Sequence, residues 1–389
     1  MFRLPSPSVP STSGGSWWLR RQRKCRNRGR SGYGPPYEGE VGRVSAGRWR
    51  AVIIESKYYR AHGLGNDYLV FQAAPPEASA EEGWLLSGEA VERICHRWEG
   101  VGSDGIVVLL DPAPGDGVFP LRMFNPDGSE FERSGNGLRI LGAHLHSAGL
   151  VEEEPFQVRS GGSLIGMQVH GRTSTGILDL SVQMGRARVG PTAVELKVPG
   201  GWVESGEAPV RLDHPSLGAV AFLAVSVGNP HAVVFTEDLS PANLEALGPF
   251  LATHPAFTRG TNVQLAWVEA PVGGPVDAPV EGGAAARVKA QVGVRDGARG
   301  RAPGPPQRLR IAIWERGVGR TSASGTSSCA ASVAAVATGR LEPGPITVEM
   351  EGGEMEVTVT TNLEVTLRGP VQEVCRGRLL PGFLESLRS

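Results

Sequence analysis

Two stretches of the chain lead into an apolar helix in the same way, and this repetition constrains the possible folds more than any other feature. Each begins with a strand-like run and a glycine-rich turn, after which a Ser-Gly pair opens the helical segment. The two copies are Ser134-Gly135 before residues 137–148 and Ser324-Gly325 before residues 326–338. We therefore predict a weak internal duplication, with one central helix in each half of the chain.

Such helix starts have a chemistry of their own. Glycine before a helix lets another group approach the backbone closely. The free N–H groups of the first helical turn, aided by the helix dipole, bind anions such as carboxylates. Two helix starts that face one another would make a small anion-lined pocket between two halves. Ordinary helix capping by serine is the alternative interpretation, and the pairing of the two motifs favours the pocket.

The rest of the chain after Lys57 is mostly short β-runs separated by glycine-rich turns. Two further segments, 84–97 and 241–251, have the spacing of amphipathic surface helices. Together with the two apolar helices, the strands indicate an α+β protein. Enrichment in β-branched residues and their spacing predict strands at 68–72, 105–110, 121–124, 157–159, 176–182, 220–227, 232–235, 261–268, 309–314, 346–350, 355–360 and 363–368.

Composition and charge exclude several classes of function. Hydrophobic residues make up 40% of the chain and charged residues 20%, which suits a globular protein with a core. The formal net charge of -1 argues against a dedicated nucleic-acid binder. No apolar run is long enough to predict a membrane span. The four cysteines are far apart without C-x-x-C spacing, which argues against a disulfide framework or a zinc site: Cys25, Cys95, Cys329 and Cys375.

The first 56 residues have the composition of a disordered basic extension. Residues 1–50 hold 11 Lys/Arg and two acids, and they show no apolar periodicity. Three interpretations stay open: a tail from a start codon assigned too far upstream, an Arg- and Ser-rich transit peptide, or a basic arm that touches nucleic acid or membrane. We favour the first interpretation, because segments that pattern as strands or helices and the motifs begin abruptly near Lys57.

A second irregular stretch, residues 271–307, interrupts two strand-like runs. It holds eight Gly and six Pro in 37 residues. Structureless loops of this length are uncommon inside compact domains. We therefore expect a flexible surface insertion without a catalytic role.

Seven short strings rich in Gly, Asn and charged residues follow one another along the chain. They are HGLGNDY at 62–68, GVGSDG at 100–105, FNPDGSE at 124–130, SGNGLR at 134–139, GNPH at 228–231, TNV at 261–263 and ERGVG at 315–319. In order and spacing they resemble diaminopimelate epimerase, over about residues 57–389 apart from the insertion. Any one string is weak, but all seven in order indicate the fold.

The resemblance implies an architecture. It is an α+β fold of two similar lobes, each a β-barrel-like sheet around a central helix, with a ligand cleft between them. Residues 57–184, with 369–389 returning to them, would form the N-terminal lobe, and residues 185–368 the C-terminal lobe. The resemblance also implies a homodimer, a small-molecule amino-acid substrate and no cofactor. We expect a cytoplasmic location and neither nucleic acid nor membrane as a partner.

The resemblance further implies a set of substrate-contact residues. An amino-acid ligand suits them, because a guanidinium can fork onto a carboxylate, a glutamate can accept from an ammonium, and asparagine can both donate and accept. The two helix starts would hold the carboxylate beside the reacting carbon. The set is Asn66, Asn125, Gly135, Asn136, Asn229, Asn262, Glu315, Arg316, Gly325 and Thr326.

The departure from the family concerns its proton-transfer groups. The family removes the α-proton with one cysteine and returns a proton from another on the opposite face. Those positions hold Ser134 and Ser324 here, our candidate catalytic residues. A thiol titrates at about 8.5 and is readily ionised, whereas a serine hydroxyl needs an adjacent base. His62, His231 and Asp67 are the candidates for such a base.

Three functions follow from this combination. The first is a working isomerase that interconverts LL- and meso-diaminopimelate in lysine and peptidoglycan precursor synthesis, with activated serines. The second is a divergent carbon-acid enzyme, a dehydratase or another isomerase. The third is a non-catalytic amino-acid-binding protein, which would keep its binding residues and lose its proton-transfer groups. Arg320, where the family has an acid, is a further departure.

Overall fold

The computed structural model describes residues 52–75, 83–198, 201–202, 209–269 and 307–388. Most of the expected basic extension and of the expected insertion therefore lie outside the described residues. Two expected boundaries need correction, since β1 begins at Ile53 and β17 at Gln307. The start of β1 pairs with a strand about 30 residues later, so that Ile54 is fully buried opposite Trp84. Local composition does not reveal such a distant partner.

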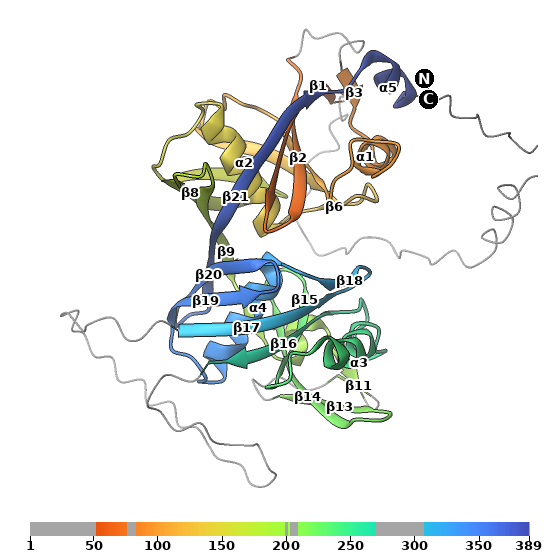
Figure 1. Cartoon of the computed structure of the whole chain (residues 1–389), viewed down its shortest axis with the longest axis vertical. Helices are drawn as coiled ribbons and strands as arrows, with labels where there is room; N and C mark the ends of the chain where they lie inside the picture. Colours follow the sequence, from red (N-terminus) through yellow and green to blue (C-terminus); the bar gives the residue numbers. More distant parts are fainter. Residues whose placement is uncertain (1–51, 76–82, 199–200, 203–208, 270–306, 389) are drawn as a thin grey trace, which may run out of the picture. The chain divides into compact units, whose positions relative to one another are not determined.

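The first part of the described chain forms a lobe around helix α2, which we call the first lobe (Figure 1). Its helices are α1 (Gly88–Cys95) and α2 (Gly135–Ser147). Strands β1, β2, β4, β8 and β9 contact α2, and so does the last strand of the chain, β21. The strands of this lobe are β1 (Ile53–Gly63), β2 (Asn66–Ala73), β3 (Gly83–Leu85), β4 (Ile106–Leu109), β5 (Val118–Phe124), β6 (Glu130–Phe131), β7 (Phe156–Ser160), β8 (Ser163–Arg172) and β9 (Leu178–Arg186).

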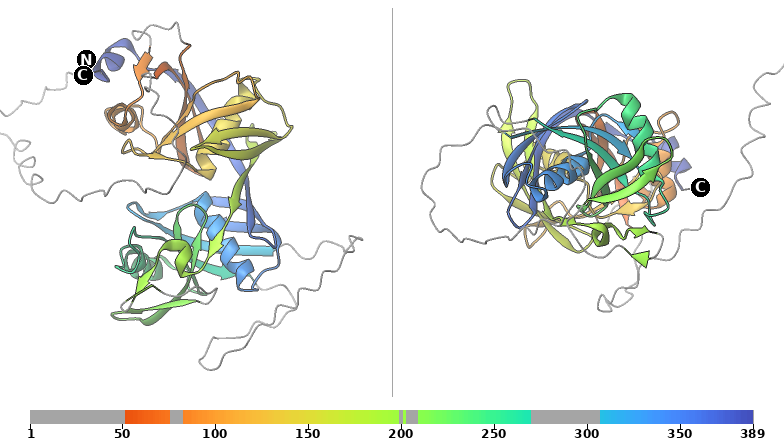
Figure 2. Two further views of the ribbon diagram at one scale, coloured as in Figure 1. Left: turned by 180° about the vertical axis from the view of Figure 1, so that it is seen from behind. Right: turned by 90° about the horizontal axis from the view of Figure 1, so that it is seen from below.

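A second lobe surrounds helix α4 (Gly325–Ala337), which Figure 2 shows from behind and from below. Strands β14 to β17 and β19 to β21 contact α4. Helix α3 (Pro241–Ala252) and the 3-10 helix η1 (Pro191–Val194) belong to this lobe. Its strands are β10 (Arg188–Val189), β11 (Lys197–Val198), β12 (Gly201–Trp202), β13 (Val210–His214), β14 (Gly218–Ser226), β15 (Pro230–Phe235), β16 (Asn262–Val268), β17 (Gln307–Glu315), β18 (Gly319–Thr321), β19 (Gly344–Met350) and β20 (Gly353–Val359).

Strand β21 (Glu364–Arg378) connects the two lobes, and α5 (Pro381–Ser386) follows it. It pairs with β20 through residues 365–368, with β9 through 364–371 and with β1 through 372–378. Nineteen of the described strands form one continuous hydrogen-bonded sheet. One apolar cluster extends from Leu138 on α2 to Ala335 on α4, so the two central helices share a core.

Small side chains let the strands enclose both central helices. Helix α4 is built almost entirely of Ala, Ser and Val, and Ala330, Ala331 and Ala334 are fully buried. In α2, Gly142 leaves room for the sheet, because an added Cβ would lie 2.7 Å from Leu180 Cδ2. Burial from several sides explains why these helices are apolar all round instead of along one stripe.

The structure confirms the predicted α+β fold of two lobes, each with a sheet around a central helix. Both central helices lie within two residues of their predicted bounds. The helix predicted at 84–97 was wrong at its start, since Trp84 belongs to β3 and the side chain of Ser87 caps α1. Strand β21 continues ten residues beyond its predicted end at residue 368. It passes through Pro370, a residue type that usually ends a strand. No helix of the described residues is long and apolar enough to span a membrane.

Candidate active site

A cavity of about 860 Å³ is lined by the N-terminal ends of both central helices. The structure brings all twelve residues singled out by the sequence into its wall. The arrangement predicted from the duplication, with two helix starts facing one pocket, is therefore found in the structure. The twelve are Asn66, Asn125, Ser134, Gly135, Asn136, Asn229, Asn262, Glu315, Arg316, Ser324, Gly325 and Thr326.

Both candidate catalytic serines cap their helices. Ser134 Oγ accepts a hydrogen bond from the backbone N–H of Gly137 at 3.1 Å, and Ser324 Oγ accepts from the N–H of Ser327 at 3.4 Å. Both residues have extended backbone, as capping residues do. Because each oxygen acts as an acceptor, each hydroxyl still has its own proton to donate.

A single methyl group lies against both helix starts. A Cβ added to Gly135 would lie 2.5 Å from Leu367 Cδ2, and one added to Gly325 would lie 2.8 Å from the same atom. The Cβ added to Gly325 would also lie 4.0 Å from the Gly135 Cα, an ordinary van der Waals contact. An alanine at either position would therefore have to displace the Leu367 methyl group, and Leu367 on β21 limits how closely the two helix ends approach.

Ser134 has a phenol as its neighbour. The phenol of Tyr68, on β2, lies beside Ser134, and both residues line the cavity. Tyr68 is buried, and its burial raises the pKa of the phenol to about 12, against the smaller lowering effect of the nearby Ser134 hydroxyl. This side of the cavity therefore presents two protonated hydroxyls at neutral pH.

Ser324 has a carboxyl group as its neighbour. Glu315, at the end of β17, lies beside Ser324 in the wall of the cavity. Burial raises the pKa of the Glu315 carboxyl above its usual value of 4.5, while the nearby Ser324 hydroxyl opposes the rise and the charge of Asp104 adds to it. A carboxylate with a raised pKa is a better proton acceptor than an ordinary one.

The bases that the sequence suggested have other partners. His231 is fully buried, and burial lowers the pKa of its imidazole to about 3. Its Nε2 lies 2.9 Å from Asn229 Oδ1. His62 lines a different cavity and its Nδ1 accepts from the Gly65 N–H. The carboxylate of Asp67 is paired with two arginines, as described below.

The sequence overlooked Tyr68 and named Glu315 only as a substrate contact. A signal for Tyr68 was present, because it ends the first of the seven strings. Neither residue could be assigned as a serine partner from the sequence, because each lies on a strand outside the helix that its serine caps.

Several cavity asparagines are already oriented by protein groups. Asn262 Nδ2 donates to the Pro230 carbonyl at 3.3 Å, and its Oδ1 accepts from the Arg316 N–H at 3.0 Å. Asn125 Nδ2 donates to Ser129 Oγ at 2.9 Å. These bonds hold each amide in one orientation and thereby pre-organise the polar wall of the cavity.

Arg320, Cys95 and Cys329 lie outside the wall of the large cavity. Arg320 pairs with Glu351 at 2.8 Å and lines a separate cavity of about 260 Å³. Burial raises the pKa of the Cys329 thiol to about 12 and that of Cys95 to about 11. Cys95 is 3% exposed, although the sequence placed it on a surface helix, because it is on the face of α1 that packs into the lobe. Neither thiol lines the large cavity.

Among the described residues, no group of three or more His, Cys, Asp or Glu side chains is arranged to hold a metal ion.

Solved structures show the class of fold. The chain resembles a hydroxyproline epimerase from Agrobacterium vitis, with a TM-score of 0.54, 14% identity and coverage of 85% of this chain and 93% of that one. It also resembles a phenazine biosynthesis protein from Bacillus anthracis, with a TM-score of 0.50, 13% identity and coverage of 85% and 99%. The fold is thus one that epimerases use.

Sequence comparison shows the family. The diaminopimelate epimerase profile matches residues 58–190 and 223–374, and the chain belongs to the diaminopimelate epimerase family. It is 33% identical to diaminopimelate epimerase 2 of Nostoc sp., over 83% of this chain and 95% of the relative. It is 32% identical to the diaminopimelate epimerase of Desulfitobacterium hafniense, over 84% and 98%. The resemblance expected from the seven strings is confirmed.

Proposed function

We propose that this protein inverts the configuration at an α-carbon of diaminopimelate or a closely related diamino dicarboxylic acid, without a cofactor. One observation carries the proposal: two serine hydroxyls at abutting helix starts line one cavity, and each has a different proton-transfer neighbour. Membership of the family supports the reaction type. The retained Asn, Glu and Arg residues of the wall support an amino-acid substrate.

The N-terminal ends of α2 and α4 would hold the carboxylate next to the reacting carbon. Their backbone N–H groups and helix dipoles favour the negative charge that spreads onto this carboxylate when the α-proton leaves. Such stabilisation acts on the intermediate more than on the substrate, so it lowers the barrier to proton removal. It depends on the backbone and survives replacement of cysteine by serine.

Proton transfer would use the two serines as relays. On one face, Ser324 takes the α-proton while its own proton passes to the Glu315 carboxylate. On the other face, Ser134 donates its proton to the carbanion and receives one from Tyr68. Glu315 then holds the extra proton and Tyr68 lacks one, so exchange with water restores the site. The reverse reaction uses the same groups in the opposite order.

The test is α-proton exchange with the full-length protein. Diaminopimelate is incubated in heavy water and loss of its α-proton signal is followed by NMR. We expect exchange above the level of a Ser134→Ala, Ser324→Ala control. If substrate binding is visible in the same spectra and exchange equals that of the control, the proposed reaction is wrong.

A non-catalytic amino-acid binder is the second candidate. The observation that favours it is that both serine oxygens already serve as helix caps and that a hydroxyl is a weaker acid than a thiol. Binding without exchange would support it. Exchange on hydroxylated amino acids alone would instead indicate the divergent carbon-acid enzyme.

The resemblance extends the proposal to the cell. It implies a homodimer in the cytoplasm that acts in lysine and peptidoglycan precursor synthesis. Light scattering after size-exclusion chromatography tests the dimer. Rescue of a bacterial strain without diaminopimelate epimerase tests the pathway, and the Ser134→Ala, Ser324→Ala variant is its control.

A further inference from the structure

Two asparagines in the cavity wall are bonded to one another. Asn136 Nδ2 donates to both the side-chain Oδ1 and the backbone carbonyl of Asn66, each at 2.7 Å. Asn136 is 6% exposed, and both hydrogens of its amide are used by these two bonds. Asn136 therefore acts on a ligand through its backbone and through Asn66, whose side chain is the more accessible of the two.

Each end of this pair of asparagines contacts a charged group that can only accept or only donate hydrogen bonds. Asn66 Nδ2 donates to Asp104 Oδ2 at 3.1 Å, and Arg139 Nη2 donates to Asn136 Oδ1 at 3.2 Å. An ionised carboxylate only accepts hydrogen bonds, and a guanidinium only donates them. The chain of bonds from Arg139 through both asparagines to Asp104 therefore has a single direction.

Reversal of the Asn66 amide would be unfavourable at both of its contacts. Its oxygen would face the carboxylate of Asp104, and its nitrogen would face the nitrogen of Asn136. An Asn amide can donate and accept, so partners that can also do both leave its orientation open. The charged ends of this chain fix the orientation.

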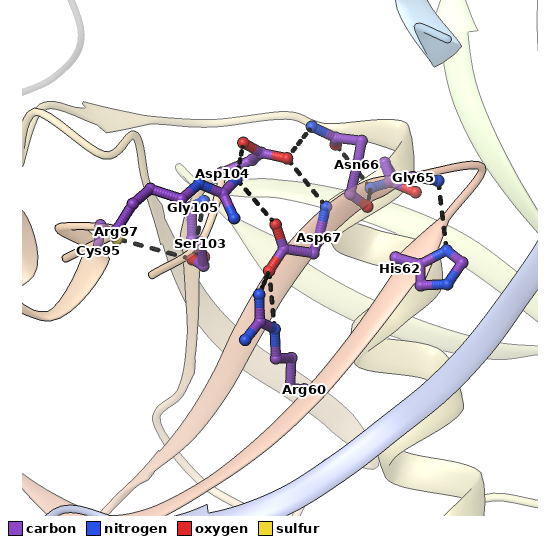
Figure 3. Close-up of polar contacts among 11 residues, drawn as sticks. Arg60, His62, Gly65, Asn66, Asp67, Cys95, Arg97, Ser103, Asp104 and Gly105 are labelled. Carbon is purple, nitrogen blue, oxygen red and sulfur yellow. Dashed lines mark hydrogen bonds and ion pairs between the residues drawn. The ribbon is translucent and has the colours of Figure 1, made fainter. Parts of the chain in front are cut away.

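Asp104 is itself held in place from several directions (Figure 3). Its Oδ2 also accepts the backbone N–H of Asp67 at 3.1 Å, and its Oδ1 pairs with Arg97. Arg97 reaches Asp67 Oδ1 at 3.1 Å, and Arg60 reaches Asp67 Oδ2 at 2.7 Å. These ion pairs join β1, β2 and the loop after α1, so the carboxylate is fixed to the first lobe from outside the cavity.

Arg139 holds the other end from within the core. It is fully buried, and its Nε has no hydrogen-bond partner among the described residues. Its Nη1 lies 3.6 Å from Met355 Sδ on β20 of the second lobe. Burial lowers the pKa of this guanidinium to about 10, which leaves it charged at neutral pH. It therefore remains a donor to Asn136.

The fixed direction leaves a defined pair of ligand-binding atoms on Asn66. One Nδ2 hydrogen and one lone pair of Oδ1 are not used by the contacts above. The lone pair can accept from the ammonium of a ligand while the hydrogen donates to its carboxylate. A head group with donor and acceptor exchanged, or one that lacks the ammonium, cannot use both atoms.

We propose that Asp104 is a positioning residue, with Arg139 as the opposing anchor, and that together they orient Asn66 to select a zwitterionic amino-acid head group. This inference rests on the amino-acid ligand of the proposed function. It adds residues outside the expected contact set and assigns them an effect on ligand selectivity. It does not require that the protein transfers a proton.

The decisive variant is Asp104→Asn, because an amide at this position can donate as well as accept and no longer enforces one orientation. Its control is Asp116→Asn in the same lobe. Asp116 also pairs with an arginine, Arg159 at 3.1 Å, and accepts a backbone N–H from Val118 at 3.1 Å, but it does not line the cavity. Both variants are checked for folding by thermal unfolding.

The first measurement is the affinity of each full-length variant for meso-diaminopimelate and for pimelate, which has the same carboxylates without the amines. We expect Asp104→Asn to lower the ratio of the two affinities about tenfold, since a hydrogen bond to a charged group is involved. Asp116→Asn should leave the ratio unchanged. A ratio for Asp104→Asn within twofold of the Asp116→Asn value would overturn the proposal.

The second measurement needs no ligand. The side-chain amide of Asn66 should give one pair of NMR signals in the unmodified protein and broadened or doubled signals in Asp104→Asn. A single sharp pair in both would overturn the proposal even if α-proton exchange occurs. Absence of exchange with altered Asn66 signals would instead overturn only the proposed reaction.

A matched pair of changes tests the other anchor. Arg139→Lys keeps a group that only donates, so the affinity ratio should persist. Arg139→Gln introduces an acceptor and should lower the ratio as Asp104→Asn does. Equal ratios in the two folded variants would remove Arg139 from the proposal. If either buried change prevents folding, the Asp104 and Asp116 variants still decide it.

Discussion

The N-terminal ends of α2 and α4 have the same backbone design and different chemistry. Each has a serine cap followed by a glycine that packs against Leu367. Ser134 faces the phenol of Tyr68, whereas Ser324 faces the carboxyl of Glu315. Neither partner belongs to its helix. The duplication thus determines where the two hydroxyls lie, and strands outside the helices determine which one is next to a base.

The difference suits a reaction that must start on one face and end on the other. A phenol with a pKa of about 12 is protonated at neutral pH and acts as an acid. A carboxylate whose pKa is raised by burial, as at Glu315, accepts a proton more readily than an ordinary one. A site with two identical hydroxyls would need outside help to ionise either one. Variants that change the two sides separately test this difference.

Thiols at both positions should have the largest effect. We expect Ser134→Cys, Ser324→Cys to raise the epimerisation rate about 1,000-fold, because a catalytic group with a pKa near the operating pH transfers protons far more readily. The rate is measured by α-proton exchange beside the two single variants. No gain in a folded double variant would mean that other residues of the cavity have diverged as well.

Removal of the carboxylate should have the next largest effect. Glu315→Gln keeps the shape and removes the base, so exchange should fall about 100-fold in the range usual for a lost general base. Tyr68→Phe should cost less, about tenfold, because water can also supply a proton to Ser134. Equal losses in the two variants would contradict the assigned asymmetry.

The pH dependence provides a check on the same carboxyl group. The pKa of Glu315 is raised, so its ionised form is lost on acidification at a higher pH than for an ordinary glutamate. Exchange in the unmodified protein should therefore decline as the pH falls towards that raised value. The residual exchange of Glu315→Gln should lack this decline.

The shared methyl contact should affect stability more at the first helix than at the second. Gly135→Ala should cost about 2 kcal/mol in the free energy of unfolding, as overpacked cores do, and Gly325→Ala somewhat less. The reason is the closer approach of Leu367 to Gly135, at 2.5 Å against 2.8 Å for an added Cβ. Urea unfolding measures both. Leu367→Ala should reduce the cost of Gly135→Ala, and strictly additive effects would exclude the contact as the cause.

The smallest effect concerns one histidine in each lobe, the partly buried His144 and the fully buried His231. Burial lowers the pKa of His144 to about 4 and of His231 to about 3 from the usual 6.5. The unfolded chain takes up these protons near pH 6.5 and the folded protein only below about pH 4, so stability is present above pH 6.5 and is lost as the pH falls. We expect Tm to drop by a few degrees between pH 7 and pH 5. His231→Gln and His144→Gln should each flatten this slope, and an unchanged slope would contradict the lowered values.

Errors of the sequence-based expectations share one cause. Trp84 resembles the start of an amphipathic helix, yet it packs edge-on against Phe71 with ring centroids 5.3 Å apart and belongs to a strand. The start of β1 was not recognised from the sequence, because it follows a basic segment and its partner β3 is distant in the sequence. Pro370 suggests the end of a strand that in fact continues along β9. In each case a long-range pairing overrides the local pattern.

The two central helices are encoded locally, by a capping serine, by glycines at a turn and by apolar composition. The residues that line the cavity were indicated by the order of the motifs and by their resemblance to the family. The group that each serine meets was not readable from the sequence, because contacts between elements depend on how the strands pack. The same holds for His231, which is buried without reaching the cavity, and for the bonds from Arg139 to Asp104. Side-chain orientation and burial are properties of the packed fold, and no local pattern contains them.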